Sequence, residues 1–176
     1  MRKFGVITSL IFIVIIIAGI YGILHDQITY SISPEYFTKF KYKQFGFESE
    51  QFGGHRATVA VIGFLATWWM GLFIGIPLGL LSLIFPDYKK MASVLKKSLF
   101  LVILIAVLTG IGGFVYGKFI LVNNGVSWWL PDDLIDKSSF IIVGSIHNSS
   151  YLGGIAGLLT ATVYMFMQKR RNNNTG

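Results

Sequence analysis

The residues of this sequence that are best suited to chemistry are three histidines, His25, His55 and His147. Each lies at one border of a long apolar segment, and two carboxylates, Asp26 and Glu35, follow the first of them closely. Imidazole nitrogens and carboxylate oxygens are ligands that proteins offer to zinc, iron, copper and manganese. The pattern predicts a transition-metal site formed by His25, Glu35 and His147, with Asp26 as a further candidate.

The same histidines also have two simpler interpretations. Histidine is amphipathic and common where a chain leaves a membrane, and no H-x-x-x-H or H-E-x-x-H spacing occurs here. Because histidine titrates near physiological pH, the three residues could also form a proton-responsive interface. His55 is the weakest ligand candidate, because it follows Gly53-Gly54 and precedes the cationic Arg56. The sequence leaves these interpretations open.

Other catalytic patterns are missing from the sequence. Cysteine is absent, so thiol chemistry is excluded, and no G-x-S-x-G, Walker A or dinucleotide fingerprint is found. Ser149 and Ser150 are next to His147, but adjacent helical positions do not face each other. Carboxylates are confined to the segment borders, whereas ion-coupled carriers place ionisable groups within the membrane. The missing motifs favour a protein without enzymatic activity, and the position of the carboxylates weighs against an ion-coupled carrier.

The elements that must position these residues are membrane helices. Of the 176 residues, 53% are hydrophobic and 13% are charged, against about 25% charged in soluble domains. A membrane helix needs roughly 20 mostly apolar residues. We therefore expect an all-α membrane protein, a four-transmembrane-helix bundle in a single domain, residues 1–176. The expected helices are 4–24, 57–85, 98–122 and 138–167, and the 25–56 and 123–147 loops form an outer-face cap.

The excess of basic residues, a net charge of +7, fits the expected topology of the protein in the membrane. Cytoplasmic flanks of membrane helices collect lysine and arginine. Nine basic residues fall on one side of a four-span chain, so both termini are expected in the cytoplasm, and binding to nucleic acid is not indicated. These residues are Arg2, Lys3, Lys89, Lys90, Lys96, Lys97, Lys169, Arg170 and Arg171. The first apolar run exceeds the 7–15 residues typical of a signal peptide and predicts a retained helix.

Within the predicted cap, the local pattern varies. Residues 27–32 alternate apolar and polar side chains and could form a short strand. Ser33-Pro34-Glu35 is typical of a helix start, and residues 37–45 fit either helix or strand. In the second loop, Pro131 followed by acids predicts another helix start.

A stripe of small residues in the second segment predicts close helix packing. The residues recur every four positions, which places them on one face of a helix, and small residues let helices approach closely in lipid. Alternatives are a seam between copies of the chain and the lining of a channel or carrier. The stripe is Gly63, Thr67, Gly71, Gly75 and Gly79, with shorter versions at Gly113, Gly117, Gly153 and Gly157.

Three segments together resemble an uncharacterised family of small bacterial inner-membrane proteins: "YGILHDQITYSISPEYFTKFKYKQF", "ATWWMGL" and "SIHNSSYLGG". The resemblance implies a bacterial origin and four spans, and it brings no assigned activity. We expect first a non-enzymatic envelope or interaction protein, with the lipid bilayer, a second copy or another membrane protein as partner. The alternatives are an outer-facing metalloprotein or metalloenzyme, and a small channel or carrier.

Overall fold

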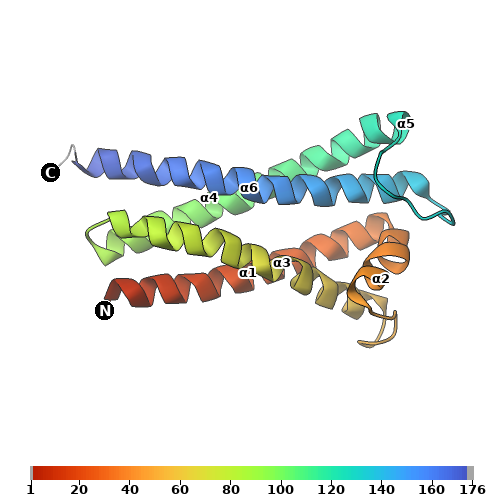
Figure 1. Ribbon diagram of the computed structural model, residues 1–176, viewed down its shortest axis with the longest axis horizontal. Helices are drawn as coiled ribbons and strands as arrows, with labels where there is room; N and C mark the ends of the chain where they lie inside the picture. Colours follow the sequence, from red (N-terminus) through yellow and green to blue (C-terminus); the bar gives the residue numbers. More distant parts are fainter. Residues whose placement is uncertain (1, 174–176) are drawn as a thin grey trace.

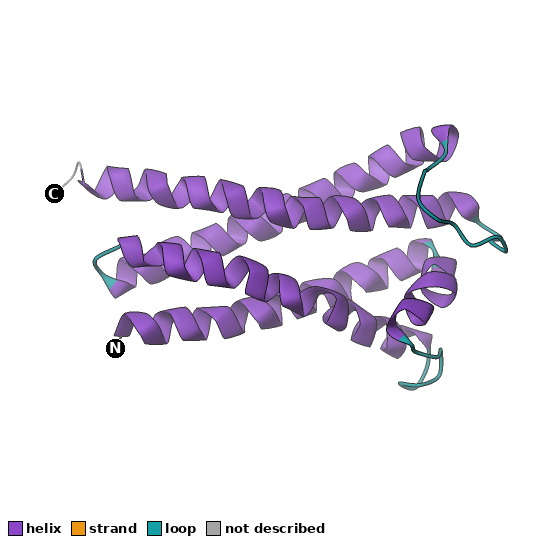
Figure 2. Ribbon diagram, in the orientation of Figure 1, coloured by secondary structure: helices purple, strands orange, loops and turns teal. Residues whose placement is uncertain are grey.

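The protein is a bundle of four long helices, seen in a computed structural model that describes residues 2–173 (Figures 1 and 2). No strand occurs within this range. All four helices are long and apolar enough to cross a membrane, which confirms the predicted all-α membrane bundle. They are α1 (Arg2–Ile32), α3 (His55–Leu81), α4 (Tyr88–Tyr116) and α6 (Lys137–Asn173). The shorter elements are η1 (Tyr36–Lys41), α2 (Tyr42–Phe45), η2 (Ser82–Ile84), η3 (Gly117–Leu121) and α5 (Val122–Asn124).

The bundle consists of two closely packed helix pairs, α1 with α3 and α4 with α6. The stripe on α3 lies in the first seam. A Cβ atom on Gly63 would clash with the Gly22 carbonyl oxygen, and the Thr67 hydroxyl donates to the Ala18 carbonyl at 2.7 Å. Further along, Cβ atoms on Gly75 and Gly79 would meet α1 at 3.5 Å and 3.1 Å. These residues pack against α1, so the geometry does not favour a pathway lined by them.

The other small residues lie in the second seam, between α4 and α6. A Cβ atom on Gly113 would come within 2.7 Å of the Ser145 carbonyl oxygen. One on Gly157 would meet the backbone of Val102 at 2.8 Å. Gly117 and Gly153 make similar approaches in the same seam. Close backbone contact through small residues is the usual way for helices to associate in lipid.

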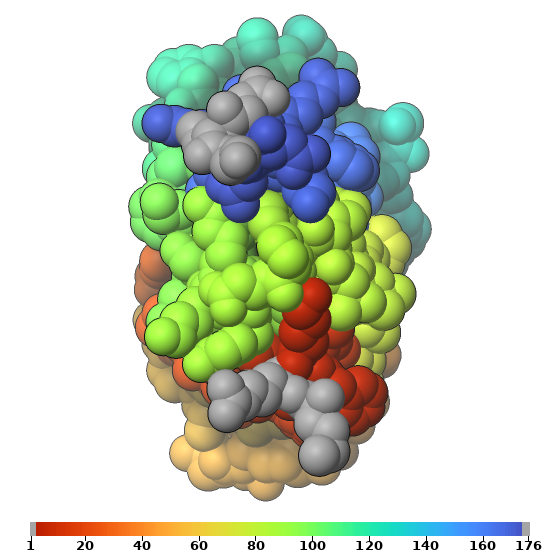
Figure 3. All heavy atoms as spheres, turned by 90° about the vertical axis from the view of Figure 1, so that its left-hand side faces the viewer, coloured from red at the N-terminus to blue at the C-terminus, as the bar shows by residue number. Residues whose placement is uncertain are grey.

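The two ends of the bundle differ. Both chain termini lie at one end, called the terminal end here, and α2 and α5 lie at the opposite, capped end (Figure 1). Seen from the terminal end, the connection between α3 and α4 lies between the two termini (Figure 3). The Lys3 ammonium donates to the Phe85 carbonyl at 2.8 Å and ties the start of α1 to this connection.

The helices at the capped end extend further than predicted. Residues 27–32 form the last turns of α1, so the predicted strand is wrong, and His25 lies two turns inside the helix. Helix α6 begins at Lys137, and the predicted start at Pro131 is also wrong. Asp136 sets the true start, because its carboxylate accepts the Ser139 N–H at 2.9 Å and caps the first turn.

Residues 36–45, between α1 and α3, are helical, which settles the ambiguity over residues 37–45. The predicted start is confirmed, because the Ser33 hydroxyl accepts the Tyr36 N–H at 3.3 Å. Tyr36 and Phe37 are buried against Phe140 and other residues that form an apolar cluster. The cap therefore consists of residues 33–54 and 125–136, which cover the ends of the four long helices at this side (Figure 1).

Candidate metal centre

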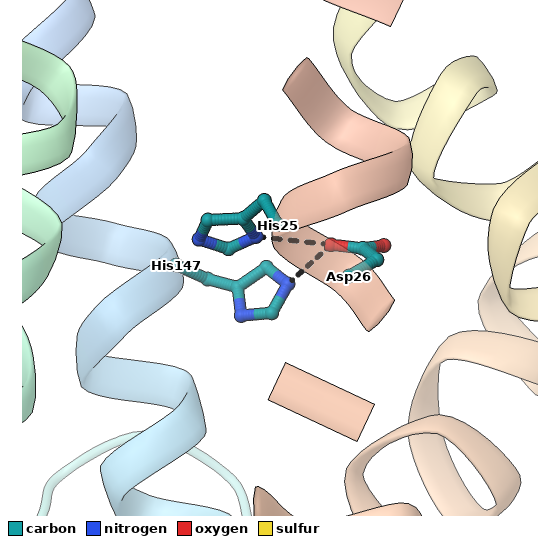
Figure 4. A group of neighbouring side chains, drawn as sticks. All are labelled: His25, Asp26 and His147. Carbon is teal, nitrogen blue, oxygen red and sulfur yellow. Dashed lines mark hydrogen bonds and ion pairs between the residues drawn. The ribbon is translucent and has the colours of Figure 1, made fainter. Parts of the chain in front are cut away.

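His25, Asp26 and His147 converge between α1 and α6 (Figure 4). Asp26 Oδ1 lies 3.1 Å from His25 Nδ1 and 3.1 Å from His147 Nε2. The two imidazole rings meet edge to face, with their centroids 4.7 Å apart. One potential ligand atom from each residue lies within 4.8 Å of the others. Two histidines that are 122 positions apart in the sequence therefore share a single carboxylate oxygen.

The cluster is buried in the bundle. Asp26 is 2% exposed and His147 is 4% exposed, while His25 is partly buried. Asp26 Oδ2 is completely enclosed and has no hydrogen-bond partner among the described residues. A buried carboxylate with an unsatisfied oxygen is costly, and ionisable groups within membrane segments usually mark a function.

The hydrogen atoms in this cluster can be placed by elimination. His147 Nδ1 lies 3.0 Å from the Val143 carbonyl oxygen, which only accepts, so Nδ1 carries a hydrogen. In a neutral imidazole, Nε2 then has a free lone pair that faces Asp26 Oδ1. Two acceptors at 3.1 Å need a positive centre between them. A proton can supply it, and so can a metal ion.

In each histidine, one ring nitrogen contacts a second polar group, and the other nitrogen faces Asp26 and could bind a metal. His25 Nε2 lies 3.3 Å from the Ser150 hydroxyl, and His147 Nδ1 donates to Val143. Metal-binding histidines are typically oriented by such a contact on the other nitrogen. In a tetrahedral zinc site with bonds of about 2.0 Å, neighbouring ligand atoms are about 3.3 Å apart. The two separations to Asp26 Oδ1, 3.1 Å each, are close to this value, and all three ligand atoms lie within 4.8 Å of one another.

All three residues form part of the wall of one partly open cavity of about 90 Å³. The four long helices all contribute to its wall, which is otherwise mostly apolar and includes Tyr21 and Ser150 near the cluster. Tyr21 also contacts the His25 ring, with the centroids 5.7 Å apart. A metal ion bound by three protein ligands would therefore have its remaining coordination position beside this cavity.

The cap covers the cluster on the other side. The Tyr36 ring stacks on His147, with the centroids 4.8 Å apart, and Phe37 is fully buried beside it. Burial raises the pKa of Tyr36, and the charge of Asp26 adds to this effect. Lys41 is 5% exposed; burial lowers its pKa, while Asp26 opposes that shift.

Glu35, a ligand predicted from the sequence, is not part of the cluster. Its carboxylate accepts backbone N–H groups from Ile135, at 3.0 and 3.1 Å, and from Asp136, at 2.7 Å. It also pairs with the Lys39 ammonium at 2.8 Å. These contacts, the Ile135 N–H first, lower the pKa of Glu35 to about 2. Glu35 instead joins the two parts of the cap, and Asp26 takes its place beside the histidines.

His55 also lies outside the cluster, at the first turn of α3. Its ring stacks on Tyr42, with the centroids 5.9 Å apart, and its Nδ1 lies 3.1 Å from the Tyr42 hydroxyl. The Tyr30 ring lies on it as well, at 6.2 Å. Next to it, the Arg56 guanidinium lies 4.7 Å from the Tyr30 ring and donates to the Gln27 carbonyl. His55 therefore helps to fasten the cap to α1 and α3.

Sequence reasoning gave Asp26 only a secondary role, although the sequence holds a signal for its burial. Asp26, Thr29 and Ser33 are each at most 2% exposed, and their spacings of three and four are those of one helix face. Ile28, which is exposed, lies on another face. Buried polar residues therefore continue along one face of α1 beyond His25, as far as Ser33 just after the helix ends. The contributions of Ser150 and Lys41 have no comparable signal.

No protein-family model, curated protein or solved structure matches the chain. The family suggested by the resemblance therefore stays a prediction, and function has to be argued from the site.

Proposed function

We propose that this multi-pass membrane protein binds a divalent transition metal, zinc or ferrous iron, through His25, Asp26 and His147. Two imidazoles and one carboxylate are a donor set that suits both ions. The ligand atoms would be His25 Nδ1, Asp26 Oδ1 and His147 Nε2. Of the functions expected from the sequence, this one is supported by a specific arrangement of side chains.

The observation that carries the proposal is the shared Asp26 oxygen. Nε2 of His147 faces it while Nδ1 is committed to the Val143 carbonyl, which is the orientation that a metal ligand requires. Asp26 Oδ2 adds an unsatisfied buried oxygen at the same place. A cation held by these three atoms would satisfy the lone pairs that face one another at Asp26 Oδ1 and the two imidazoles, and it would offset part of the cost of burying the carboxylate.

Elemental analysis of the purified protein tests the proposal. We expect one equivalent of zinc or iron in the wild type and its loss in Asp26→Asn, since an amide is a much poorer ligand for these ions. Glu35→Gln is the matched control, because Glu35 lies in the cap and outside the cluster. Wild-type protein that stays metal-free after incubation with either ion would refute the proposal.

We further propose a bacterial inner membrane location with the terminal end in the cytoplasm. The nine basic residues named above belong to the two chain ends and the α3–α4 region, which supports this direction. Reporter fusions at Gly46, Met91 and Gly176 should then read outside, inside and inside. An outside signal at Met91 would reverse the direction and would place the metal centre toward the cytoplasm.

A further inference from the structure

A second pocket lies in the cap, and most of its wall consists of aromatic rings. It is partly open and has a volume of about 270 Å³. Its rings come from η1, from the connection before α6 and from the start of α6: Tyr36, Phe40, Trp128, Trp129 and Phe140. None of the three proposed metal ligands lines this pocket. It is therefore a site distinct from the metal centre.

The rings stand at steep angles to one another and so form walls. The Tyr36 ring lies 5.3 Å from the Phe40 ring and 5.0 Å from the Phe140 ring, centroid to centroid, at 71° and 53°. The Phe40 and Trp129 rings are 6.5 Å apart at 50°. Gly144 contributes no side chain, and a Cβ atom there would already lie 3.7 Å from the Tyr36 ring. The glycine therefore helps to keep the space between the rings open.

The surroundings of this pocket carry an excess of negative charge. The connection of residues 125–136 holds three aspartates and no basic residue. Glu35 precedes the first ring, and its partner Lys39 also pairs with Asp133 at 3.2 Å. Over residues 35–40 and 125–140, four acids face only two lysines, Lys39 and Lys137. This balance favours a ligand with a positive charge.

We propose that the aromatic pocket binds a trimethylammonium group, such as that of choline or of a phosphatidylcholine headgroup. The face of an aromatic ring attracts a cation within about 6 Å of its centre, and cages of such rings recognise quaternary ammonium groups. The inference goes beyond the proposed metal binding and does not depend on it.

The chemistry of the wall selects this cation over other ligands. Among the described residues, no carboxylate and no basic side chain forms part of the wall. A metal ion or a primary ammonium would lose water or hydrogen bonds there without a charged acceptor in return. A trimethylammonium group has no N–H to satisfy, and its charge is spread over methyl groups that suit an aromatic wall. A sugar would need several hydrogen bonds, whereas Asn148 supplies a single amide.

Anchoring in the membrane accounts for only part of this arrangement. Tryptophan is common at the membrane border, and Trp129, which is 64% exposed, suits that role. Tyr36 and Phe140 are buried, however, and a pocket remains between their rings and the tryptophans. An anchor needs no such pocket, whereas a ligand does.

The test compares choline with its neutral analogue 3,3-dimethylbutan-1-ol, in which carbon replaces the charged nitrogen. Both are titrated by calorimetry into full-length protein in dodecyl maltoside, a detergent without an ammonium group. We expect one choline per chain, bound about tenfold more tightly than the alcohol, because only the cation is attracted by the ring faces. Equal affinities, or no binding of choline, would overturn the inference.

A matched pair of variants tests the site itself. Trp129→Leu keeps an apolar side chain but removes an aromatic wall, and Trp68→Leu makes the same change at a position 37% exposed on α3, outside the pocket. We expect choline affinity to fall about tenfold in the first variant and to stay at the wild-type level in the second. Phe40→Leu repeats the test on η1, in case Trp129→Leu does not fold. Wild-type affinity in a folded variant of either wall residue would overturn the inference.

Two lipids then distinguish the source of the group. Dioleoyl phosphatidylcholine in mixed micelles should displace choline if a lipid headgroup occupies the pocket, and a lack of displacement assigns the site to a soluble ligand. Dioleoyl phosphatidylethanolamine, a primary ammonium, should not displace choline, and equal displacement by both lipids would overturn the assignment to trimethylammonium. Asp26→Asn should bind choline like the wild type, which separates failure of the metal proposal from failure of this inference.

Discussion

Asp26 Oδ1 lies 3.1 Å from His147 Nε2, and this contact joins two helices whose residues are 121 positions apart in the sequence. Asp26 belongs to the α1–α3 pair and His147 to the α4–α6 pair. The polar cluster therefore lies at the junction of two units that pack mainly within themselves. A bound metal would connect these units through coordination bonds.

Removing either histidine should lower both metal content and thermal stability. A metal that binds only the folded protein stabilises it by about 2.7 kcal/mol when its free concentration is 100 times Kd. His25→Ala and His147→Ala should each lose this contribution, and the double variant should lose little more, because either change dismantles the same site. Melting in detergent, with and without chelator, measures the effect.

If the histidines are instead ordinary residues of the membrane border, the results differ. The two single variants should then have small effects that add in the double variant. A chelator should also leave the melting temperature of the wild type unchanged. Either result would count against a shared metal site.

Ser150 should tune metal affinity without acting as a ligand. Its hydroxyl lies 3.3 Å from His25 Nε2, the nitrogen that does not face Asp26. Loss of such a contact typically weakens metal binding about 10- to 100-fold. We expect Ser150→Ala to bind one equivalent of metal with an affinity reduced in this range. The control is Ser149→Ala, and competition with a metal-sensitive dye measures both. Equal affinities would exclude this role for Ser150.

Glycines inside and outside the helix seams should respond differently to substitution by alanine, according to the space around them. A Cβ atom on Gly63 would clash with the Gly22 backbone, whereas Gly112 on α4 has no atom within 4 Å of that position. Gly63→Ala should reduce the free energy of unfolding by about 1–3 kcal/mol through overpacking. Gly112→Ala should instead increase it by roughly 0.5–1 kcal/mol, because alanine favours the helix. A stable Gly63→Ala protein would contradict the observed packing.

Glu35 should make the cap sensitive to acid. Its pKa is lowered from 4.5 to about 2 in the folded protein, mainly by the Ile135 N–H. A carboxylate with a lowered folded pKa contributes stability above its unfolded pKa, and this contribution is lost as pH falls through the folded value. Melting temperature should therefore fall between about pH 4.5 and pH 2. This part of the pH dependence should be weaker in Glu35→Gln and unchanged in Glu50→Gln, an exposed acid of the same connection. Identical pH profiles for all three proteins would exclude the contact as a source of stability.

The fold could be predicted because its main cause is composition. Apolar segments of about 20 residues with few charges have to form membrane helices, and small residues every four positions mark where such helices approach closely. Helix ends were predicted less well. Around Ile28, apolar and polar residues alternate, and this local pattern by itself predicts a strand. The buried positions Asp26, Thr29 and Ser33, however, follow the period of a helix.

The candidate site could be predicted only in part. The common depth of His25 and His147 follows from the four spans, and the structure brings both residues together. The choice between Asp26 and Glu35 depends on which way each carboxylate points, which the sequence pattern did not decide. Glu35 turns toward the free N–H groups of Ile135 and Asp136, which belong to a distant part of the chain. Long-range contacts of this kind leave no periodic signal.

X-ray absorption spectroscopy of the purified, metal-loaded protein would show the ligands of the metal themselves. We expect nitrogen and oxygen ligands at about 2.0–2.2 Å, together with the outer-shell scattering of two imidazole rings. In His147→Ala the imidazole contribution should fall to one ring or the metal should be lost. A spectrum without imidazole scattering in the wild type, or one unchanged in His147→Ala, would contradict a metal centre built from His25, Asp26 and His147.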